Sequence, residues 1–126
     1  MWWLTTKRKE NEMNLLVIVV SELDYKEDVF LALQSVGITK ASVFDAMSMD
    51  RSLESEYSLF TGFMKSRAEN EGEQLVILAP IESPSIAKEL LSNLEAAGIP
   101  LKKQEILHLA VLPVAFCFDQ STGLCE

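Results

Sequence analysis

Short apolar runs alternate along the chain with longer segments in which apolar residues recur at helical spacing. Residues 15–20 are apolar throughout and rich in β-branched side chains, a pattern typical of a buried strand. In the segment that follows, Val29, Leu33 and Val36 form one helical stripe. The stripe ends at Gly37, and glycine adopts the left-handed conformation after a helix without a steric penalty. This part of the sequence therefore predicts a strand followed by a helix.

The boundaries of this first helix and the next strand are predicted from short signals. Ser21 or Asp24 is the expected N-cap, since a side-chain oxygen there can accept from the free N–H groups of the first turn. Residues 38–46 contain adjacent β-branched and aromatic side chains and are predicted to form a second strand.

The same order of elements returns about sixty residues later. Residues 75–79 predict a third strand, which Pro80 is expected to end because proline cannot donate to a strand ladder. Ser83-Pro84 is a capping residue followed by proline at the first helical position, and Gly98-Ile99 closes this helix as a glycine-isoleucine pair closes the first. Residues 104–112 predict a fourth strand.

The resulting βαββαβ order predicts an α+β fold, a ferredoxin-like sandwich with both helices on one face of the sheet. When one face of an antiparallel sheet is open to solvent, polar and apolar residues normally alternate along each strand. Residues 15–20, 75–79 and 109–112 are instead apolar at consecutive positions, so both faces are apolar. Each aliphatic side chain left in water forfeits roughly 1.5–3 kcal/mol. We therefore expect the open face to be covered by self-association.

A long connection separates the second and third strands. Within residues 47–74, apolar and aromatic side chains recur at helical spacing, which predicts an extra helix over residues 53–67. The residues of its stripe are Leu53, Tyr57, Phe60 and Met64. Two interpretations stay open: internal packing onto the assembly, or a surface that binds a protein partner.

Composition and charge narrow the function classes. The formal net charge is −8, which disfavours binding to a phosphate backbone, and no apolar run approaches the roughly 20 residues of a membrane helix. Residues 1–12 are expected to be a disordered leader before a single domain over 13–126, in the cytoplasm. Cys117 and Cys125 belong to no CxxC pair or His/Cys cluster, so free thiols are expected and a zinc site is not.

Candidate catalytic chemistry is sparse. His108 is the single histidine, and without a nearby nucleophile it is expected to be a hydrogen-bonded strand residue at a subunit interface. Asp45 and Asp50 could pair as carboxylates, although surface acids at this density are usually solvated. No nucleotide-binding, metalloprotease or nucleophile-elbow motif occurs. The sequence therefore predicts no enzyme, no catalytic residue, no metal and no cofactor.

Three segments carry a resemblance to a known family. Residues 13–20, residues 37–43 with Gly-Ile-Thr-Lys-Ala-Ser-Val, and residues 109–114 with a Pro-Val ending resemble the nitrogen-regulatory PII-like signalling proteins. The resemblance covers residues 13–118. It implies a compact trimer whose sheets line the centre, with ligands bound in clefts between subunits and a flexible partner-docking loop in the central connection.

The chain also departs from that family. Typical members have a glycine-rich, phosphate-binding loop between the second helix and the last strand, whereas residues 98–103 hold one glycine and two lysines, so ATP binding does not carry over. By the resemblance, Lys102 and Lys103 open into the intersubunit cleft and face Arg51 of a neighbour, and these three cations are the predicted site for a small anion.

The leading hypothesis is therefore a trimeric sensor of a small anionic ligand that signals through residues 47–72. An enzyme or metal-binding protein on a ferredoxin-like scaffold is one alternative. A structural adaptor without a ligand is the other.

Overall fold

The computed structural model describes residues 13–49, 72–120 and 123–124. Its elements, in chain order, are β1 (Asn14–Val20), the 3-10 turn η1 (Leu23–Tyr25), α2 (Lys26–Ser35), β2 (Ser42–Met47), β3 (Glu73–Ile81), α4 (Pro84–Ala96), β4 (Leu107–Pro113), β5 (Phe118–Asp119) and β6 (Gly123–Leu124). The first six strands and helices follow the predicted βαββαβ order. The leader predicted for residues 1–12 and the extra helix predicted for 53–67 lie outside the described residues.

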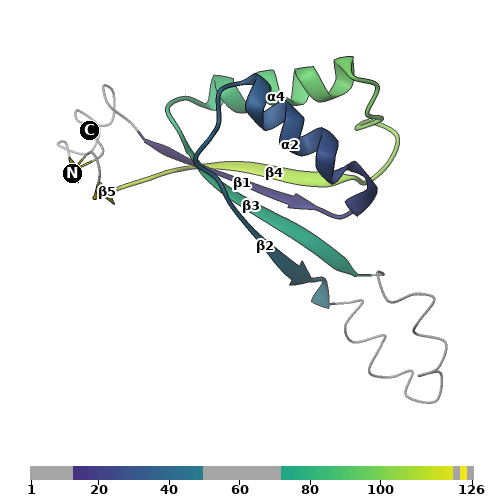
Figure 1. The fold of residues 1–126 in the computed structure, drawn as a ribbon, viewed down its shortest axis with the longest axis horizontal. Helices are drawn as coiled ribbons and strands as arrows, with labels where there is room; N and C mark the ends of the chain where they lie inside the picture. Colours follow the sequence, from purple (N-terminus) through teal and green to yellow (C-terminus); the bar gives the residue numbers. More distant parts are fainter. Residues whose placement is uncertain (1–12, 50–71, 121–122, 125–126) are drawn as a thin grey trace.

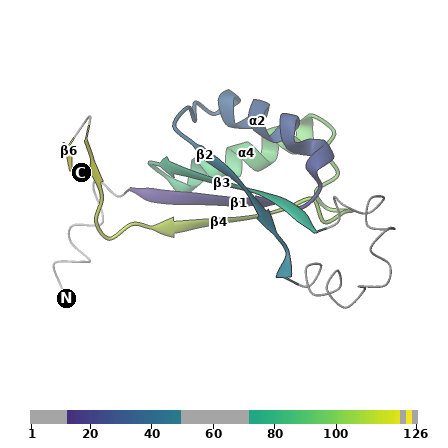
Figure 2. The ribbon, with the colours of Figure 1, turned by 60° about the horizontal axis from the view of Figure 1, so that its bottom comes forward.

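The main sheet has four antiparallel strands in the order β2-β3-β1-β4. Helices α2 and α4 lie side by side over one face of it, and no described helix lies over the other (Figures 1 and 2). The predicted ferredoxin-like α+β architecture is therefore confirmed. The central strands β1 and β3 pair over their full common length, from Asn14 opposite Ile81 to Val20 opposite Leu75.

Alternate residues of the strands build the core beneath the two helices. In β1 the buried positions are Leu16, Ile18 and Val20, because successive side chains of a strand point to opposite faces. They pack with inward-facing residues of the helices and of β3. The largest fully buried side chains are Leu16, Ile18, Ile77, Leu90, Leu94, Ile106, Val20 and Val29.

Both helices end in the same way, as the sequence repeat predicted. Gly37 and Gly98 have φ of 82° and 93°, in the left-handed region that favours glycine. The next N–H reaches back five residues in each case, from Ile38 to the Leu33 carbonyl oxygen at 3.0 Å and, after α4, between the equivalent pair at 3.1 Å. Each isoleucine is buried and anchors its helix end to the core.

The two helix beginnings differ. Ser83 caps α4 as predicted, with its Oγ accepting from the N–H of Ser85 at 3.2 Å and Pro84 in the first turn. The predicted capping of α2 by Ser21 or Asp24 is wrong. The turn η1 intervenes, so α2 starts at Lys26 with no side-chain cap on its N-terminus.

Two strand boundaries also differ from the sequence prediction. Pro80 does not end β3, which continues to Ile81 with Pro80 opposite Leu15. Strand β2 pairs with β3 only as far as Leu78, so Pro80 lies where one edge of β3 has no neighbour and proline is tolerated. Strand β2 itself begins at Ser42, later than predicted, and ends at Met47.

Beyond β4 the chain forms a small two-stranded sheet, β5 with β6, which the sequence pattern did not predict. Cys117, just before β5, is in a disulfide bond, so the expectation of a free thiol at this position is wrong. The other cysteine of the sequence, Cys125, lies outside the described residues. Lys40 also ties this region to the body, with its Nζ 3.5 Å from the Asp119 carboxylate.

Candidate functional site

The turn after α4 holds the two lysines that the sequence singled out. Its backbone is folded back on itself, because the N–H of Leu101 donates to the Ile99 carbonyl at 2.8 Å. The Pro100 carbonyl in turn accepts from Lys103 at 3.1 Å and Gln104 at 3.2 Å. The turn is therefore a closed, internally bonded structure, with Leu101 packed against the core.

Both lysines of this turn are exposed. The Nζ of Lys102 lies 3.9 Å from the carboxylate of Glu95 in the last part of α4, and the lysine side chain keeps 87% of its exposure. An ion pair that long and that solvated contributes little to stability. Lys102 and Lys103 are therefore held loosely by the protein and remain open to an external anion.

The backbone of the turn cannot grip a polyphosphate as a glycine-rich loop does. Such a loop offers several free, converging N–H groups to the anion. Here the N–H groups of Leu101, Lys103 and Gln104 are already donated within the turn. Any anion bound at this place would be held mainly by side chains.

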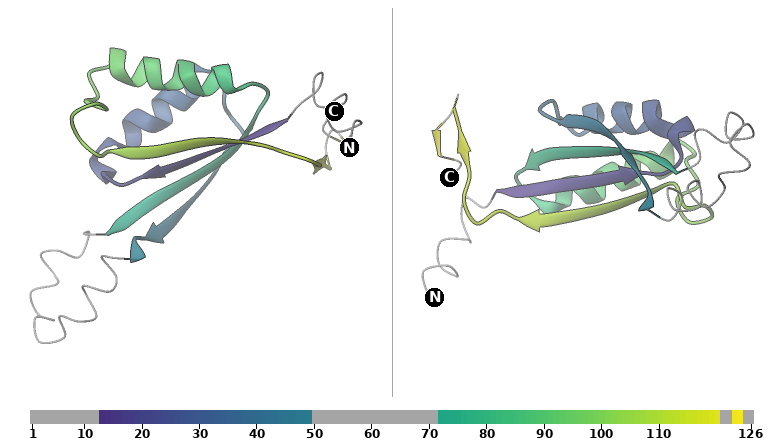
Figure 3. Two further views of the ribbon diagram at one scale, coloured as in Figure 1. Left: turned by 180° about the vertical axis from the view of Figure 1, so that it is seen from behind. Right: turned by 90° about the horizontal axis from the view of Figure 1, so that it is seen from below.

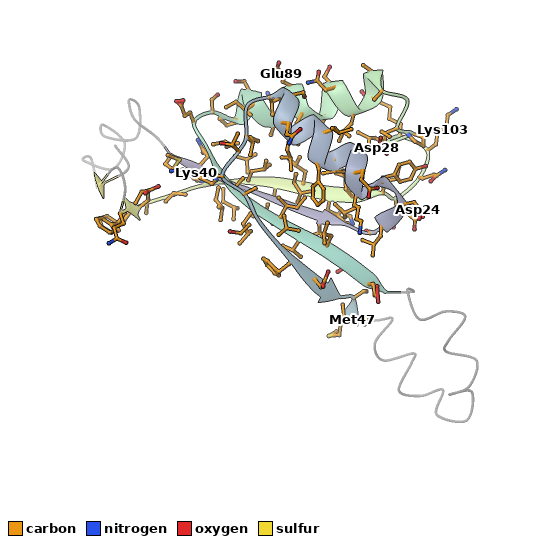
Figure 4. All side chains as sticks on the ribbon, in the orientation of Figure 1. Asp24, Asp28, Lys40, Met47, Glu89 and Lys103 are labelled. Atoms are coloured by element: carbon orange, nitrogen blue, oxygen red, sulfur yellow. The ribbon has the colours of Figure 1, made fainter. Side chains whose placement is uncertain are left out.

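The surroundings of the turn include acidic residues. The N–H groups of Ser21 and Glu22 both donate to the Ile106 carbonyl, at 2.7 and 3.2 Å, so the segment leading into η1 is fastened to the end of the turn. Glu22 and Asp24 are exposed there, and Figure 4 shows Lys103 and Asp24 at the same end of the molecule. These carboxylates oppose the attraction of the two lysines for an anion.

The predicted three-cation site is thus only partly visible within one chain. Lys102 and Lys103 lie together on one turn, whereas Arg51 lies outside the described residues. Met47, the last residue of β2, marks where the central connection leaves the sheet (Figure 4). Across the ranges 13–49 and 72–120, no group of three His, Cys, Asp or Glu side chains is arranged to hold a metal ion.

The second candidate surface is the face of the sheet opposite the helices, which we call the open face (Figure 3, right). Strand register assigns the residues to it, because paired residues of antiparallel strands lie on the same side. They are Leu15, Val17 and Val19 of β1, Ser42, Phe44 and Ala46 of β2, Gln74, Val76, Leu78 and Pro80 of β3, and His108, Ala110 and Leu112 of β4. None of these is Asp, Glu, Lys or Arg.

One row of side chains crosses all four strands of the open face. Phe44 lies opposite Val76, Val76 opposite Val19, and Val19 opposite His108. Phe44 is 47% exposed, and His108 is exposed as well. The sequence correctly placed His108 on a strand, but its position at one end of an apolar row follows only from the register.

Some features of the surface had no sequence signal. Strand β2 is exposed on both faces, so Val43 and Met47 on its helix side are uncovered as well. Near the small sheet, Phe116 and Phe118 are also exposed. Isolated apolar residues could not be assigned to a surface without knowing where the two helices end.

None of the helices in the part of the chain that the structure describes is long and apolar enough to cross a membrane.

The fold is similar to those of several solved structures. A structure of Arabidopsis thaliana PII bound to citrate matches with a TM-score of 0.54 and 15% identity, over 90% of this chain and 87% of that one. The B. subtilis GlnK–ATP complex matches with a TM-score of 0.54 and 13% identity, over 90% of this chain and 91% of that one. CPII from Thiomonas intermedia K12, bound to ADP, AMP and acetate, matches with a TM-score of 0.51 and 18% identity, over 82% of this chain and 86% of that one.

At the level of sequence, the chain matches no protein-family profile and no curated protein. The likeness is therefore one of fold, and it extends over most of the chain and most of each similar structure. It agrees with the resemblance carried by residues 13–20, 37–43 and 109–114. This chain has a divergent PII-like fold.

Proposed function

We propose that this chain is a PII-like regulatory protein that self-associates through the open face and senses a small anionic ligand between subunits. The observation that carries the proposal is an open face without fixed charges, in a chain whose net charge is −8. Acidic side chains crowd the rest of the sequence, so their exclusion from one whole sheet face favours an interface over solvent contact.

Self-association explains why the open face is apolar. Leu112 is 50% exposed and Phe44 47% exposed, and burying such side chains releases roughly 25 cal/mol for each Å² of apolar surface. A second copy of the chain is the partner that every molecule has at hand. The number of subunits, three, comes from the PII-like resemblance.

The proposed ligand is a small anion bound by side chains. The similar structures contain citrate, ATP, or ADP with AMP and acetate, all of which carry carboxylate or phosphate groups. In this chain Lys102 and Lys103 would provide point charges, and Arg51 of a neighbouring subunit would provide a planar fork. The internally bonded turn favours compact anions such as citrate over polyphosphates.

The test combines light scattering with a thermal-shift screen. Light scattering of the full chain should give the mass of a trimer. Citrate, acetate, ADP and ATP are then tested, because a ligand that binds only the folded state raises the melting temperature. The double substitution Lys102→Ala with Lys103→Ala should abolish the shift and leave the trimer intact. Lys88→Ala with Lys26→Ala, which removes two exposed helix lysines, is the matched control.

Other results would favour the alternatives. If an anion raised the melting temperature of the double variant as much as that of wild type, this turn would be ruled out as the site. A trimer that none of the anions stabilises would favour the adaptor, with residues 47–67 as its contact with a protein partner. A turnover product or stoichiometric metal in the purified protein would favour the enzyme or metal-binding protein.

We propose that the protein acts in the cytoplasm, and the disulfide of Cys117 is the observation that disagrees. Reducing compartments normally keep thiols free. Rapid alkylation of the protein in cells with a mass-tagging thiol reagent shows whether Cys117 is reduced or in a disulfide there. A tagged Cys117 would support the cytoplasmic assignment, and an untagged one would contradict it.

A further inference from the structure

We propose that His108 makes self-association through the open face dependent on protonation, with assembly favoured at pH 7.5 and opposed at pH 5.5. The inference rests on the proposed function, because it requires the open face to be an interface. Its basis is that, within the part of the chain that the structure describes, His108 is the only titratable side chain that the strands place on that face.

The geometry puts the imidazole among apolar neighbours. His108 lies directly opposite Val19 of β1, with Val17 diagonal to it and Ala110 next along the same side of β4. Val76 and Phe44 continue the row across β3 and β2. A copy that covers the whole row, from Phe44 at one edge to His108 at the other, removes water from around His108.

Among the described strands, no Asp, Glu, Lys or Arg lies on the open face to offset that loss of water. The β1 and β3 residues beside the row are aliphatic apart from Gln74, and β2 contributes Ser42 and Ala46. Asp45 of β2 and Glu73 of β3 lie on the other, helix side of the sheet. The charged residues that flank β4 and β1 along the chain are Glu105, before β4, and Glu22, after β1. Both are exposed and outside the paired register of the strands.

Physical chemistry then gives the sign of the effect. Desolvation disfavours the charged form of an imidazole, and a neutral imidazole can be buried at much lower cost. Histidine exchanges its proton between about pH 5 and 8. A protonated imidazole on this face would have to release its proton before the face is buried, so acidification opposes the assembly.

Sedimentation of the full-length protein at pH 7.5 and 5.5, over a series of concentrations, tests the inference. We expect the concentration that gives half-assembly to be at least about tenfold higher at pH 5.5 for wild type. His108→Gln keeps a polar side chain that does not titrate, and it should remain assembled at both pH values. Acidification also reduces the net charge of −8, which promotes association in general and so acts in the opposite direction.

The outcomes separate this inference from the proposed function. Equal assembly of wild type at both pH values would overturn the role of His108 and leave self-association standing. The same loss at pH 5.5 in His108→Gln would also overturn it, by assigning the effect to other groups. A wild-type monomer at pH 7.5 would contradict self-association itself. Circular dichroism at both pH values verifies that each protein stays folded.

Discussion

The two faces of the sheet carry nearly the same kinds of residues but differ in how deeply those residues are buried. In β1, Leu16, Ile18 and Val20 are buried beneath the helices, whereas the alternate residues Leu15 and Val17 remain partly exposed. Residue type does not distinguish the two sets, because both are aliphatic. The covering helices account for the difference, and a strand that is apolar on both faces indicates that a second cover is required.

Strand β2 extends the comparison to the edge of the sheet. It projects beyond the two helices, and five of its six residues are exposed, the exception being the half-buried Ala46 (Figure 1). Phe44 belongs to the open face, and Val43 lies on the helix side. The helices therefore bury the inward side chains of β1 and most of those of β3, and half-bury Leu107, Leu109 and Val111 of β4. Among the described residues, none gives β2 a comparable cover.

The largest expected effect comes from placing a charge on the covered face. Ile77 is fully buried in β3, and Ile77→Glu would put a carboxylate in the core with no partner. Such a group costs on the order of 3–5 kcal/mol, comparable with the whole stability of a small domain. We expect the variant to be unfolded or to melt far below wild type, as measured by circular dichroism.

The neighbouring residue provides the control for this substitution. Val76 precedes Ile77 in the same strand but lies on the open face, so Val76→Glu adds an identical charge where water can reach it in an isolated subunit. The isolated subunit should remain folded. Equal loss of structure in both variants would contradict the assignment of the two faces.

The next effect concerns assembly instead of folding. Val17 lies near the middle of the open face, between Leu78 of β3 and Ala110 of β4. With Val17→Glu, every subunit would bring a carboxylate of the same sign into the buried interface. We therefore expect a folded monomer by light scattering. Leu31→Glu is the control, because Leu31 is 63% exposed on α2, away from the sheet. Assembly that survives Val17→Glu would place the interface elsewhere.

Local sequence signals were sufficient for much of the fold. The paired glycine-isoleucine helix ends, the Ser83 cap and the apolar strands were all predictable, because each depends on interactions within a few residues of the chain. Pro80 was misread because its tolerance depends on where a different strand, β2, ends. The turn η1 has no side-chain cap to mark it, so the start of α2 was also missed.

The candidate sites were less predictable than the fold. Lys102 and Lys103 stood out in an acidic chain, but neither the internal bonding of their turn nor the acidic residues beside it is visible in the sequence. His108 was recognised as a strand residue, and only the register with Val19 places it on a face without fixed charges. Long-range pairing supplies that information, and no local pattern encodes it.

The smallest expected effects come from two leucines on opposite faces of one strand. Leu109 of β4 packs against the core, whereas Leu112 lies on the open face and is 50% exposed. Both are changed to alanine in the Val17→Glu background, so that assembly makes no contribution to the measured stability. In urea unfolding, Leu109→Ala should lose about 1–2 kcal/mol, because the leucine is only partly buried.

Leu112→Ala should lose no more than about 0.5 kcal/mol in that background, since its side chain is already in contact with water. In the wild-type background the order reverses for assembly: Leu112→Ala should raise the concentration needed for half-assembly, and Leu109→Ala should leave it nearly unchanged. The reversal is specific to a sheet whose two apolar faces are covered by different molecules. If Leu112→Ala destabilised the monomer as much as Leu109→Ala, the open face would already be covered within one chain.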